Sequence, residues 1–159
     1  MSSEKKKVLI TGGTGFVGSY LFDYLSKNKN YDVFVSSRRN IEKAIRLDLL
    51  DIYEIRKTFM EYEFDKIFHL TSQSSVHLSF KNPFSTLYDN INTTLNLLKI
   101  IYESKLNTKV VLASTSEVYK TSEKELTEDS SFEPRNPYAI SKIIVDYFSK
   151  NISKDLDHA

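Results

Sequence analysis

The chain has 159 residues, enough for one layered domain but not for a second of ordinary size. Its 22 Lys and Arg nearly balance its 21 Asp and Glu, which excludes the basic surface typical of nucleic-acid or membrane binding. Because cysteine is absent, disulfides, thiolate metal sites and a cysteine nucleophile are excluded, and no apolar stretch resembles a signal peptide or a membrane span. We therefore expect a single cytoplasmic module that binds neither nucleic acid nor membrane.

The first predicted elements are a strand, a glycine-rich turn and a helix. A β-branched run at 7–11 predicts the strand, and apolar residues at helical spacing follow from residue 16. The chain's only four glycines lie at this junction, and they are Gly12, Gly13, Gly15 and Gly18. In a dinucleotide-binding turn, glycines permit a tight bend, a close approach of backbone N–H groups to a pyrophosphate, and close helix packing. The junction predicts nucleotide binding; an ordinary tight turn is the alternative.

Strand-like and helix-like segments alternate along the rest of the chain. The strand-like runs are 32–36, 66–70 and 109–113. The helix-like segments are 51–61, 83–102 and 138–148. This alternation predicts an α/β fold, a Rossmann-like parallel sheet with helices on both faces. The last two helices are apolar on more than one face, so part of each could meet a partner.

The end of the 32–36 strand bears on the choice of nicotinamide cofactor. Folds that prefer NAD place an acid near this edge, whereas an arginine there accommodates the 2′-phosphate of NADP. Here Arg38 and Arg39 follow the strand, and no acid stands at its end. A guanidinium matches a phosphate well, so the sequence favours NADP over NAD. Two solvated arginines are the alternative.

Two pairs of residues in the second half of the chain suggest acid/base chemistry. Tyr138 and Lys142 stand one helical turn apart, so their side chains share a face, where an ammonium favours the phenolate. Thr115 and Glu117 follow the 109–113 strand, at the carboxyl edge where open α/β sheets bind ligands. The alternatives are a tyrosine at a helix start with a surface lysine, and a glutamate that caps a helix or loop on a solvated surface.

Four motifs in order resemble the extended short-chain dehydrogenase/reductase family, whose NAD-dependent epimerases and dehydratases modify nucleotide sugars. They are TGGTGFVG at 11–18, HLTSQSSV at 69–76, STSEVY at 114–119 and NPYAISK at 136–142. The resemblance covers almost the whole chain. Segments 31–39, 114–117 and 134–142 are similar to GDP-mannose 4,6-dehydratases, whereas 72–83 is similar to GDP-4-keto-6-deoxymannose reductases.

The resemblance implies roles for individual residues. Tyr138 would be the acid/base, Lys142 would also hold the nicotinamide ribose, Thr115 would hydrogen-bond the reacting hydroxyl, and Glu117 would remove the sugar C5 proton. Asp48 matches an adenine-contacting acid, the alternative being an N-cap for the next helix. The implied cofactor-binding residues are Gly12, Thr14, Gly15, Phe16, Gly18, Arg38, Arg39, Asp48, Leu49, Leu70, Tyr138 and Lys142. No metal is implied.

The expected function is that of an NADP-dependent nucleotide-sugar 4,6-dehydratase with a GDP-linked substrate, homodimeric through helices 83–102 and 138–148. A GDP-4-keto-6-deoxymannose reductase and a non-catalytic NADP-binding module are the alternatives. Family members carry a further C-terminal half with most of the sugar pocket. We expect residues 1–159 to form the NAD(P)-binding Rossmann domain without that substrate domain, truncated after the YxxxK helix, with 109–113 as an edge strand and weak or absent turnover. A fragment, a split gene product and a stand-alone module remain open.

Overall fold

The computed structural model describes residues 4–156, and the side chains of residues 4–153. Its contacts separate two compact units, each of which is described by itself. The first contains the described residues up to Thr71 together with Thr93–Ala113. The second contains Ser72–Asn92 together with the described residues from Ser114 onward. Helix α4 (Pro83–Glu103) contributes residues to both units.

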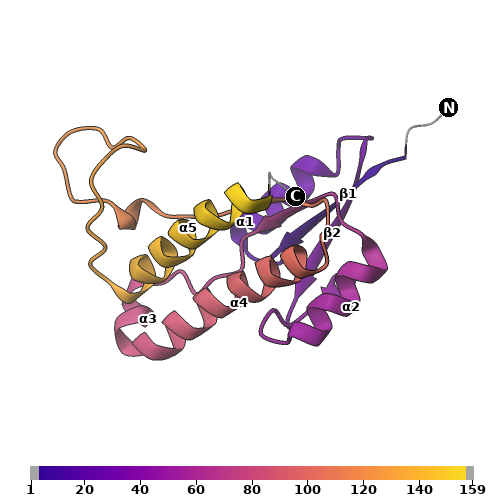
Figure 1. Ribbon diagram of the computed structural model, residues 1–159, viewed down its shortest axis with the longest axis horizontal. Helices are drawn as coiled ribbons and strands as arrows, with labels where there is room; N and C mark the ends of the chain where they lie inside the picture. The colour runs from indigo at the N-terminus through magenta and orange to yellow at the C-terminus, as the bar shows by residue number, and fades with distance from the viewer. Residues whose placement is uncertain (1–3, 157–159) are drawn as a thin grey trace. The chain divides into compact units, whose positions relative to one another are not determined.

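The first unit is built on a five-stranded parallel sheet (Figure 1). Its strands are β1 (Lys6–Thr11), β2 (Tyr31–Ser37), β3 (Ile45–Arg46), β4 (Lys66–His69) and β5 (Lys109–Leu112). They lie in the order β3-β2-β1-β4-β5, so the first strand is central. This order matches the first five strands of the Rossmann order 3-2-1-4-5-6, and it confirms the predicted α/β class.

Helices cover both faces of this sheet because successive residues of β1 point to opposite sides. Leu9, fully buried, packs in one cluster with residues of α2 (Ile52–Tyr62) and of the second half of α4. Its neighbours Val8 and Ile10 pack in another cluster, with Leu25 of α1 (Phe16–Leu25). One short apolar run thus supplies both layers of core, as the alternation of strands and helices predicts.

Helix α4 buries only part of the apolar stripe that its helical spacing predicts. That stripe contains Phe84, Leu87, Tyr88, Ile91, Leu95, Leu98 and Tyr102. Leu98 is buried and its other aliphatic members are half-buried, whereas its three aromatic members are exposed. The residues of α4 that join the core are Leu97, Leu98, Ile100 and Ile101. The sheet is therefore covered by leucine and isoleucine side chains, and the aromatic ones stay at the surface.

Several short elements were not predicted. They are β3, the helix α3 (Val76–Lys81) and the 3-10 helix η1 (Ser116–Val118). Helix α5 (Pro137–Leu156) begins where the sequence predicts, since proline is tolerated in a first turn, but it runs beyond residue 148. None of the helices in residues 4–156 is sufficiently long and apolar to cross a lipid bilayer.

Strand β5 lies at the edge of the sheet, as the sequence predicts. It pairs with β4 alone among the described strands, from Lys66 opposite Lys109 to His69 opposite Leu112. The side chain of Val111 is 52% exposed, which is unusual for a β-branched residue of a parallel sheet.

Candidate functional site

The turn after β1 requires glycine for reasons that the structure makes explicit. Gly12 has a φ of +68°, in the left-handed region, and a Cβ there would lie 3.0 Å from the backbone nitrogen of Thr71. Its carbonyl accepts a hydrogen bond from the N–H of Gly15 at 3.0 Å, which closes the turn. A Cβ on Gly18 would lie 2.5 Å from the same carbonyl oxygen, so α1 packs directly against the turn. Two of the predicted glycine roles, the bend and the close packing, are thus visible.

The start of α1 is suited to a phosphate group. The N-cap residue is Gly15, which has no side chain to cap the first N–H groups of the helix. A Cβ on it would meet only the Gly12 carbonyl oxygen, at 3.2 Å. Thr14 and Phe16 beside it are exposed, Phe16 to 80%. Accessible N–H groups at the positive end of a ten-residue helix fit a pyrophosphate.

Gly13 was not among the predicted site residues, and the structure gives it a packing role. A Cβ at Gly13 would lie 2.5 Å from Cγ1 of Val35 and 3.0 Å from the carbonyl oxygen of Ile10. Val35 belongs to β2 and pairs in register with Ile10. The glycine therefore lets the turn lie flat on the neighbouring strand. The sequence did contain a signal for this packing role, namely a fourth glycine beside Gly12, Gly15 and Gly18.

Both candidate arginines lie beside the glycine turn. The register pairs Thr11, the last residue of β1, with Ser36 of β2. Gly12 follows Thr11 at the end of β1, and Arg38 and Arg39 follow Ser36 by two and three residues at the end of β2. Both segments therefore leave the sheet at the same edge. Both arginines are exposed, and the N–H of Arg39 donates to the hydroxyl of Ser37 at 3.1 Å. Their guanidinium groups are thus accessible at the edge where the turn presents its N–H groups.

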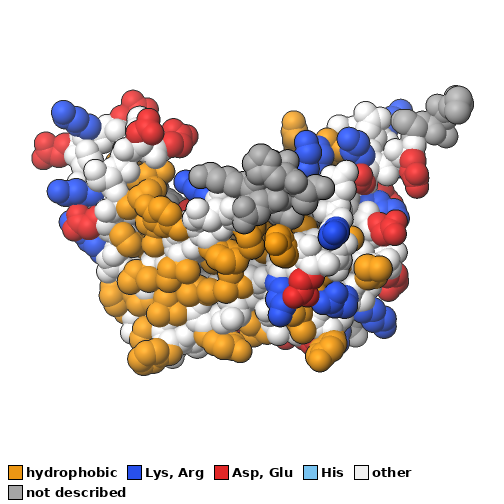
Figure 2. Space-filling view, viewed as in Figure 1, with side chains coloured by type: hydrophobic (Ala, Val, Ile, Leu, Met, Phe, Trp, Pro, Cys, Tyr) orange, Lys and Arg blue, Asp and Glu red, His pale blue; other side chains and the backbone are white. Residues whose placement is uncertain are grey.

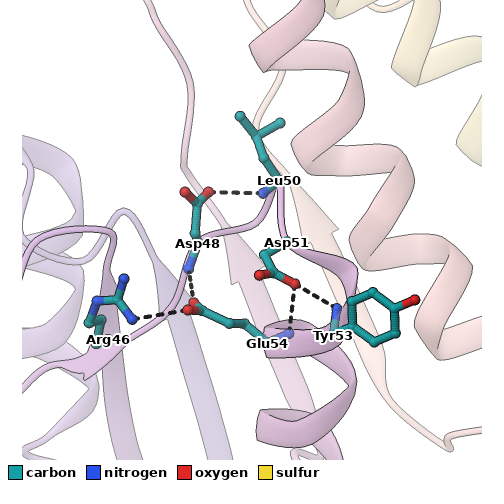
Figure 3. A network of polar contacts seen from close by, with 6 residues as sticks. All are labelled: Arg46, Asp48, Leu50, Asp51, Tyr53 and Glu54. Atoms are coloured by element: carbon teal, nitrogen blue, oxygen red, sulfur yellow. Dashed lines mark hydrogen bonds and ion pairs between the residues drawn. The ribbon is translucent and has the colours of Figure 1, made fainter.

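Asp48 lies after β3 in a polar cluster shown in Figure 3. Its carboxylate accepts a hydrogen bond from the N–H of Leu50 at 3.0 Å, and its own N–H donates to Glu54 at 2.9 Å. The N-cap of α2 is Asp51, whose carboxylate accepts from Tyr53 at 2.8 Å and from Glu54 at 3.1 Å. The alternative reading of Asp48 as that cap is therefore wrong.

Leu49 and Leu70, the apolar members of the predicted cofactor set, differ in burial. Leu49 is buried in the core, and its carbonyl accepts from the side-chain amide of Asn96 at 3.1 Å. Leu70 is half-buried and packs on the α1 side of the sheet. Just before it, His69 is buried and bridges the hydroxyls of Thr11, at 2.8 Å, and Thr94, at 3.1 Å. His69 thus ties β4 to β1 and α4.

In the second unit, Thr115 and Glu117 form the start of η1. The hydroxyl of Thr115 accepts a hydrogen bond from the N–H of Glu117 at 3.3 Å, which caps this short helix. The carboxylate of Glu117 accepts from the side-chain amide of Asn136 at 3.0 Å. Glu117 is exposed in the first turn of η1 and is held by this contact, so both the catalytic and the surface capping interpretation stay open. Asn136 was not a predicted site residue.

Tyr138 and Lys142 share one face of α5, as their spacing predicts. The Lys142 ammonium lies 5.9 Å from the centroid of the Tyr138 ring, and the two residues are 7% and 8% exposed respectively. Burial lowers the pKa of Lys142 from its ordinary value, and the negative charge of Asp146, one turn on, opposes this shift. Tyr138 does stand at the start of a helix, but Lys142 is not a surface lysine.

A buried polar network in the second unit supports the helix that carries these two residues. The side-chain amide of Asn90, on α4, donates to the carbonyl of Gln73 at 3.1 Å and to the hydroxyl of Ser141 at 3.0 Å. Its oxygen accepts from the N–H of Gln73 at 2.7 Å. Ser141, fully buried, donates in turn to the carbonyl of Tyr138 at 2.6 Å. Sequence reasoning missed this network because Asn90 and Ser141 are 51 residues apart.

An open groove in the second unit contains only one of the predicted catalytic residues. Its walls include Thr115, Val118, Phe132, Asp146 and Lys150. The hydroxyl of Ser114 donates to the Asp146 carboxylate at 2.5 Å in the same wall. Since neither Glu117 nor Tyr138 lines this groove, it does not by itself unite the catalytic set.

Comparison with known proteins settles the family. The family model for GDP-mannose 4,6 dehydratase matches residues 9–158. The chain belongs to this family. The resemblance of its motifs to nucleotide-sugar epimerases and dehydratases is thereby confirmed.

Among similar proteins is the dTDP-D-glucose 4,6-dehydratase of Homo sapiens, 32% identical over 90% of this chain and 45% of the relative. The GDP-mannose 4,6-dehydratase of Vibrio cholerae is 35% identical over 90% of this chain and 46% of the relative. A solved structure of UDP-glucose 4-epimerase from Bifidobacterium longum, in complex with NAD+ and UDP, superposes with a TM-score of 0.82. It is 25% identical, over 92% of this chain and 49% of that one. The chain thus spans about half the length of these relatives.

Proposed function

We propose that this chain is the cofactor-binding and acid/base part of an NADP-dependent nucleotide-sugar 4,6-dehydratase whose substrate is GDP-linked. The observation that carries the proposal is Glu117, an exposed carboxylate held in place two residues after Thr115, in a unit that also buries Tyr138 beside Lys142. A dehydratase needs a base for a C–H proton in addition to the tyrosine that serves the sugar hydroxyl. The family membership and the Vibrio cholerae relative support a GDP-linked substrate.

The cofactor would be held by the first unit. The N–H groups at the start of α1 fit the pyrophosphate, and Arg38 and Arg39 fit the 2′-phosphate of NADP. When bound, NADP would supply the acceptor for the hydrogen on the sugar C4 and later return it to C6. The residues proposed to contact it are Gly12, Thr14, Gly15, Phe16, Gly18, Arg38, Arg39, Asp48, Leu49, Leu70, Tyr138 and Lys142.

The chain's own residues would manage the protons. Tyr138, as phenolate, would take the proton of the sugar O4 while C4 becomes a ketone, with the Lys142 ammonium beside its ring to stabilise the negative charge. The hydroxyl of Thr115 would donate a hydrogen bond to O4. The new ketone makes the C5 proton acidic, and Glu117 would remove it and pass it to the C6 hydroxyl, which leaves as water. The proton that Tyr138 took from O4 would go to C5 when the hydrogen returns to C6.

Two alternatives keep specific support. Segment 72–83 resembles GDP-4-keto-6-deoxymannose reductases, and a reductase would consume NADPH where a dehydratase leaves the cofactor unchanged. The coverage of only about half of each relative keeps a non-catalytic NADP-binding module open. Absorbance at 340 nm during incubation with GDP-mannose or its 4-keto product separates the two enzymes. A module would bind NADP but form no product, even with a complementing C-terminal half.

The first test of the proposal is calorimetric binding of NADP and NAD to the 159-residue chain and to Arg38→Asp/Arg39→Asp. Losing the arginine contacts to a 2′-phosphate should weaken NADP binding about 10- to 100-fold and leave NAD binding nearly unchanged. A matched control is Lys27→Asp/Lys29→Asp, which changes the net charge equally but at exposed positions before the other end of β2. Equal NADP affinity in wild type and the arginine variant would contradict the cofactor assignment.

We further propose a cytoplasmic homodimer that pairs through the helices 83–102 and 138–148. In the second unit, hydrophobic side chains gather over α3, the first half of α4 and α5 (Figure 2). The exposed ones on α4 and α5 include Phe84, Tyr88, Ile144, Tyr147 and Phe148. An apolar face of this kind is typical of an interface between helices. A monomer in sedimentation at high micromolar concentration would contradict the dimer.

A further inference from the structure

Asn136, directly before α5, uses both ends of its side-chain amide. Its Oδ1 accepts a hydrogen bond from the N–H of Ala139 at 2.8 Å, the usual N-cap contact at the start of a helix. Its Nδ2 donates to Oε2 of Glu117 at 3.0 Å. The residue is 5% exposed, so neither contact is easily replaced by water.

The helix cap fixes which way round this amide lies. A backbone N–H can only donate, so the atom that faces Ala139 must be the amide oxygen, and the NH₂ group must face Glu117. Glu117 therefore meets a donor. The amide therefore ties one oxygen of Glu117 to the start of the helix, and this limits the rotation of the side chain.

We infer that Asn136 is a positioning residue that fixes the carboxylate of Glu117 as a proton acceptor next to the first turn of the helix that carries Tyr138. The inference deepens the proposed function and rests on it for the identity of the proton. The contact engages Oε2 of Glu117. The role of Glu117 as base rests on the proposed function. Tyr138 follows Asn136 by two residues, so one amide sets the places of both groups.

Charged residues of the surrounding segments have partners of their own. The guanidinium of Arg135, next in sequence, is ion-paired with Glu133 at 2.8 Å. On α5, the Asp146 carboxylate accepts from Ser114, and Lys142 lies by the Tyr138 ring. The hydrogen bond that the Glu117 carboxylate accepts comes from Asn136 and not from one of these charged groups.

The first experiment uses NMR to compare the side-chain amide protons of Asn136 at neutral pH in the wild-type chain and in Glu117→Ala. Without the carboxylate these protons lose their acceptor, so in Glu117→Ala they should move upfield and exchange faster with solvent. The replaced side chain is exposed, and both proteins are expected to fold. Unchanged amide protons in the variant would overturn the inference.

The second experiment measures how rigidly the Glu117 side chain is held, from the NMR relaxation of its methylene carbons. Asn136→Ser keeps a capping oxygen but loses the amide donor, and Asn136→Asp keeps the cap but places a like charge beside Glu117. The order parameter of the Glu117 side chain should fall in both variants.

A matched control is Asn151→Asp, which adds the same charge to α5 about 22 Å further along its axis. Asn151 is exposed and donates to the carbonyl of Tyr147, so this variant should leave the order parameter of Glu117 unchanged. Equal values in all four proteins would refute the positioning role. Neither readout needs turnover: the expected loss of order without dehydration of any sugar nucleotide would refute only the proposed function, whereas dehydration without that loss would refute only the inference.

Discussion

Replacing Gly13 with alanine should destabilise the chain although its backbone conformation would accept the new side chain. The cost comes from one contact, since the added Cβ would lie 2.5 Å from Cγ1 and 2.6 Å from Cβ of Val35. Carbon atoms pack at about 3.5 to 4.0 Å, so turn and strand would have to separate by about 1 Å. Val35 is held by its pairing with Ile10 in β1, which limits that movement.

Overpacking of this kind costs about 1–3 kcal/mol, and we expect Gly13→Ala to lie in the upper half of that range because the facing strand is paired. For a chain of this length such a loss would lower the melting temperature by about 4 to 12 °C. Val35→Ala removes the contact with Cγ1 and keeps the contact with Cβ at 2.6 Å, so it relieves the overlap only in part. The double variant should therefore be less destabilised than the sum of the single variants, by about 0.5 kcal/mol.

Urea unfolding of the four proteins of this double-mutant cycle gives the coupling, provided the urea dependence is unchanged. Gly15→Ala is the matched control: its Cβ would meet only the Gly12 carbonyl oxygen, at 3.2 Å, so its loss should be about 1 kcal/mol or less. A Gly13→Ala protein as stable as Gly15→Ala, or strictly additive effects with Val35→Ala, would refute the packing argument.

Two further predictions concern the helix of the Tyr138 and Lys142 pair. Because burial lowers the pKa of Lys142 below 10.5, its charged form costs stability at pH 7, and wild-type stability should rise with pH as the proton leaves. Lys142→Met should therefore be more stable than wild type in urea at pH 7, by a margin that shrinks toward pH 10; a margin that grows with pH would contradict the cause. Asn90→Ala removes three hydrogen bonds and should cost about 2–4 kcal/mol, whereas Asn92→Ala, which loses one bond to Tyr88, should cost under about 1 kcal/mol. Equal thermal shifts for these two variants would show that the buried network contributes nothing.

Local sequence patterns were sufficient to predict the principal elements. The run before Gly12 and the apolar spacing after Phe16 predict β1 and α1, because their signals lie within a few residues of each other. Strand β3 has only two residues, which is too short for an alternation of apolar and polar residues to be recognised. Helix α3 has six residues, which is too short for a helical period to be recognised. The exposed aromatic face of α4 shows a further limit, since periodicity identifies an apolar stripe but not what the stripe meets.

The candidate site divides in a similar way. Tyr138 and Lys142 could be predicted as neighbours because a helix fixes residues four apart on one face. The contact between Glu117 and Asn136 could not, because it joins two segments 19 residues apart with no regular element between them. The role of Gly13 depends on Val35, which belongs to another strand. Such contacts depend on tertiary packing, which the pattern of residues along the sequence does not reveal.

The central place of β1 has a consequence for synthesis of the chain. Its residues Val8, Leu9 and Ile10 are fully buried, yet β1 is translated before every strand that it pairs with. Thr11 lies opposite His69, 58 residues later, so at 5–20 residues per second the second partner emerges about 3 to 12 s after β1. During that interval this strand, whose last four residues are fully buried in the folded chain, is at most half paired. The nascent chain should therefore depend on chaperones until β4 has left the ribosome, and slower translation should lower the soluble yield.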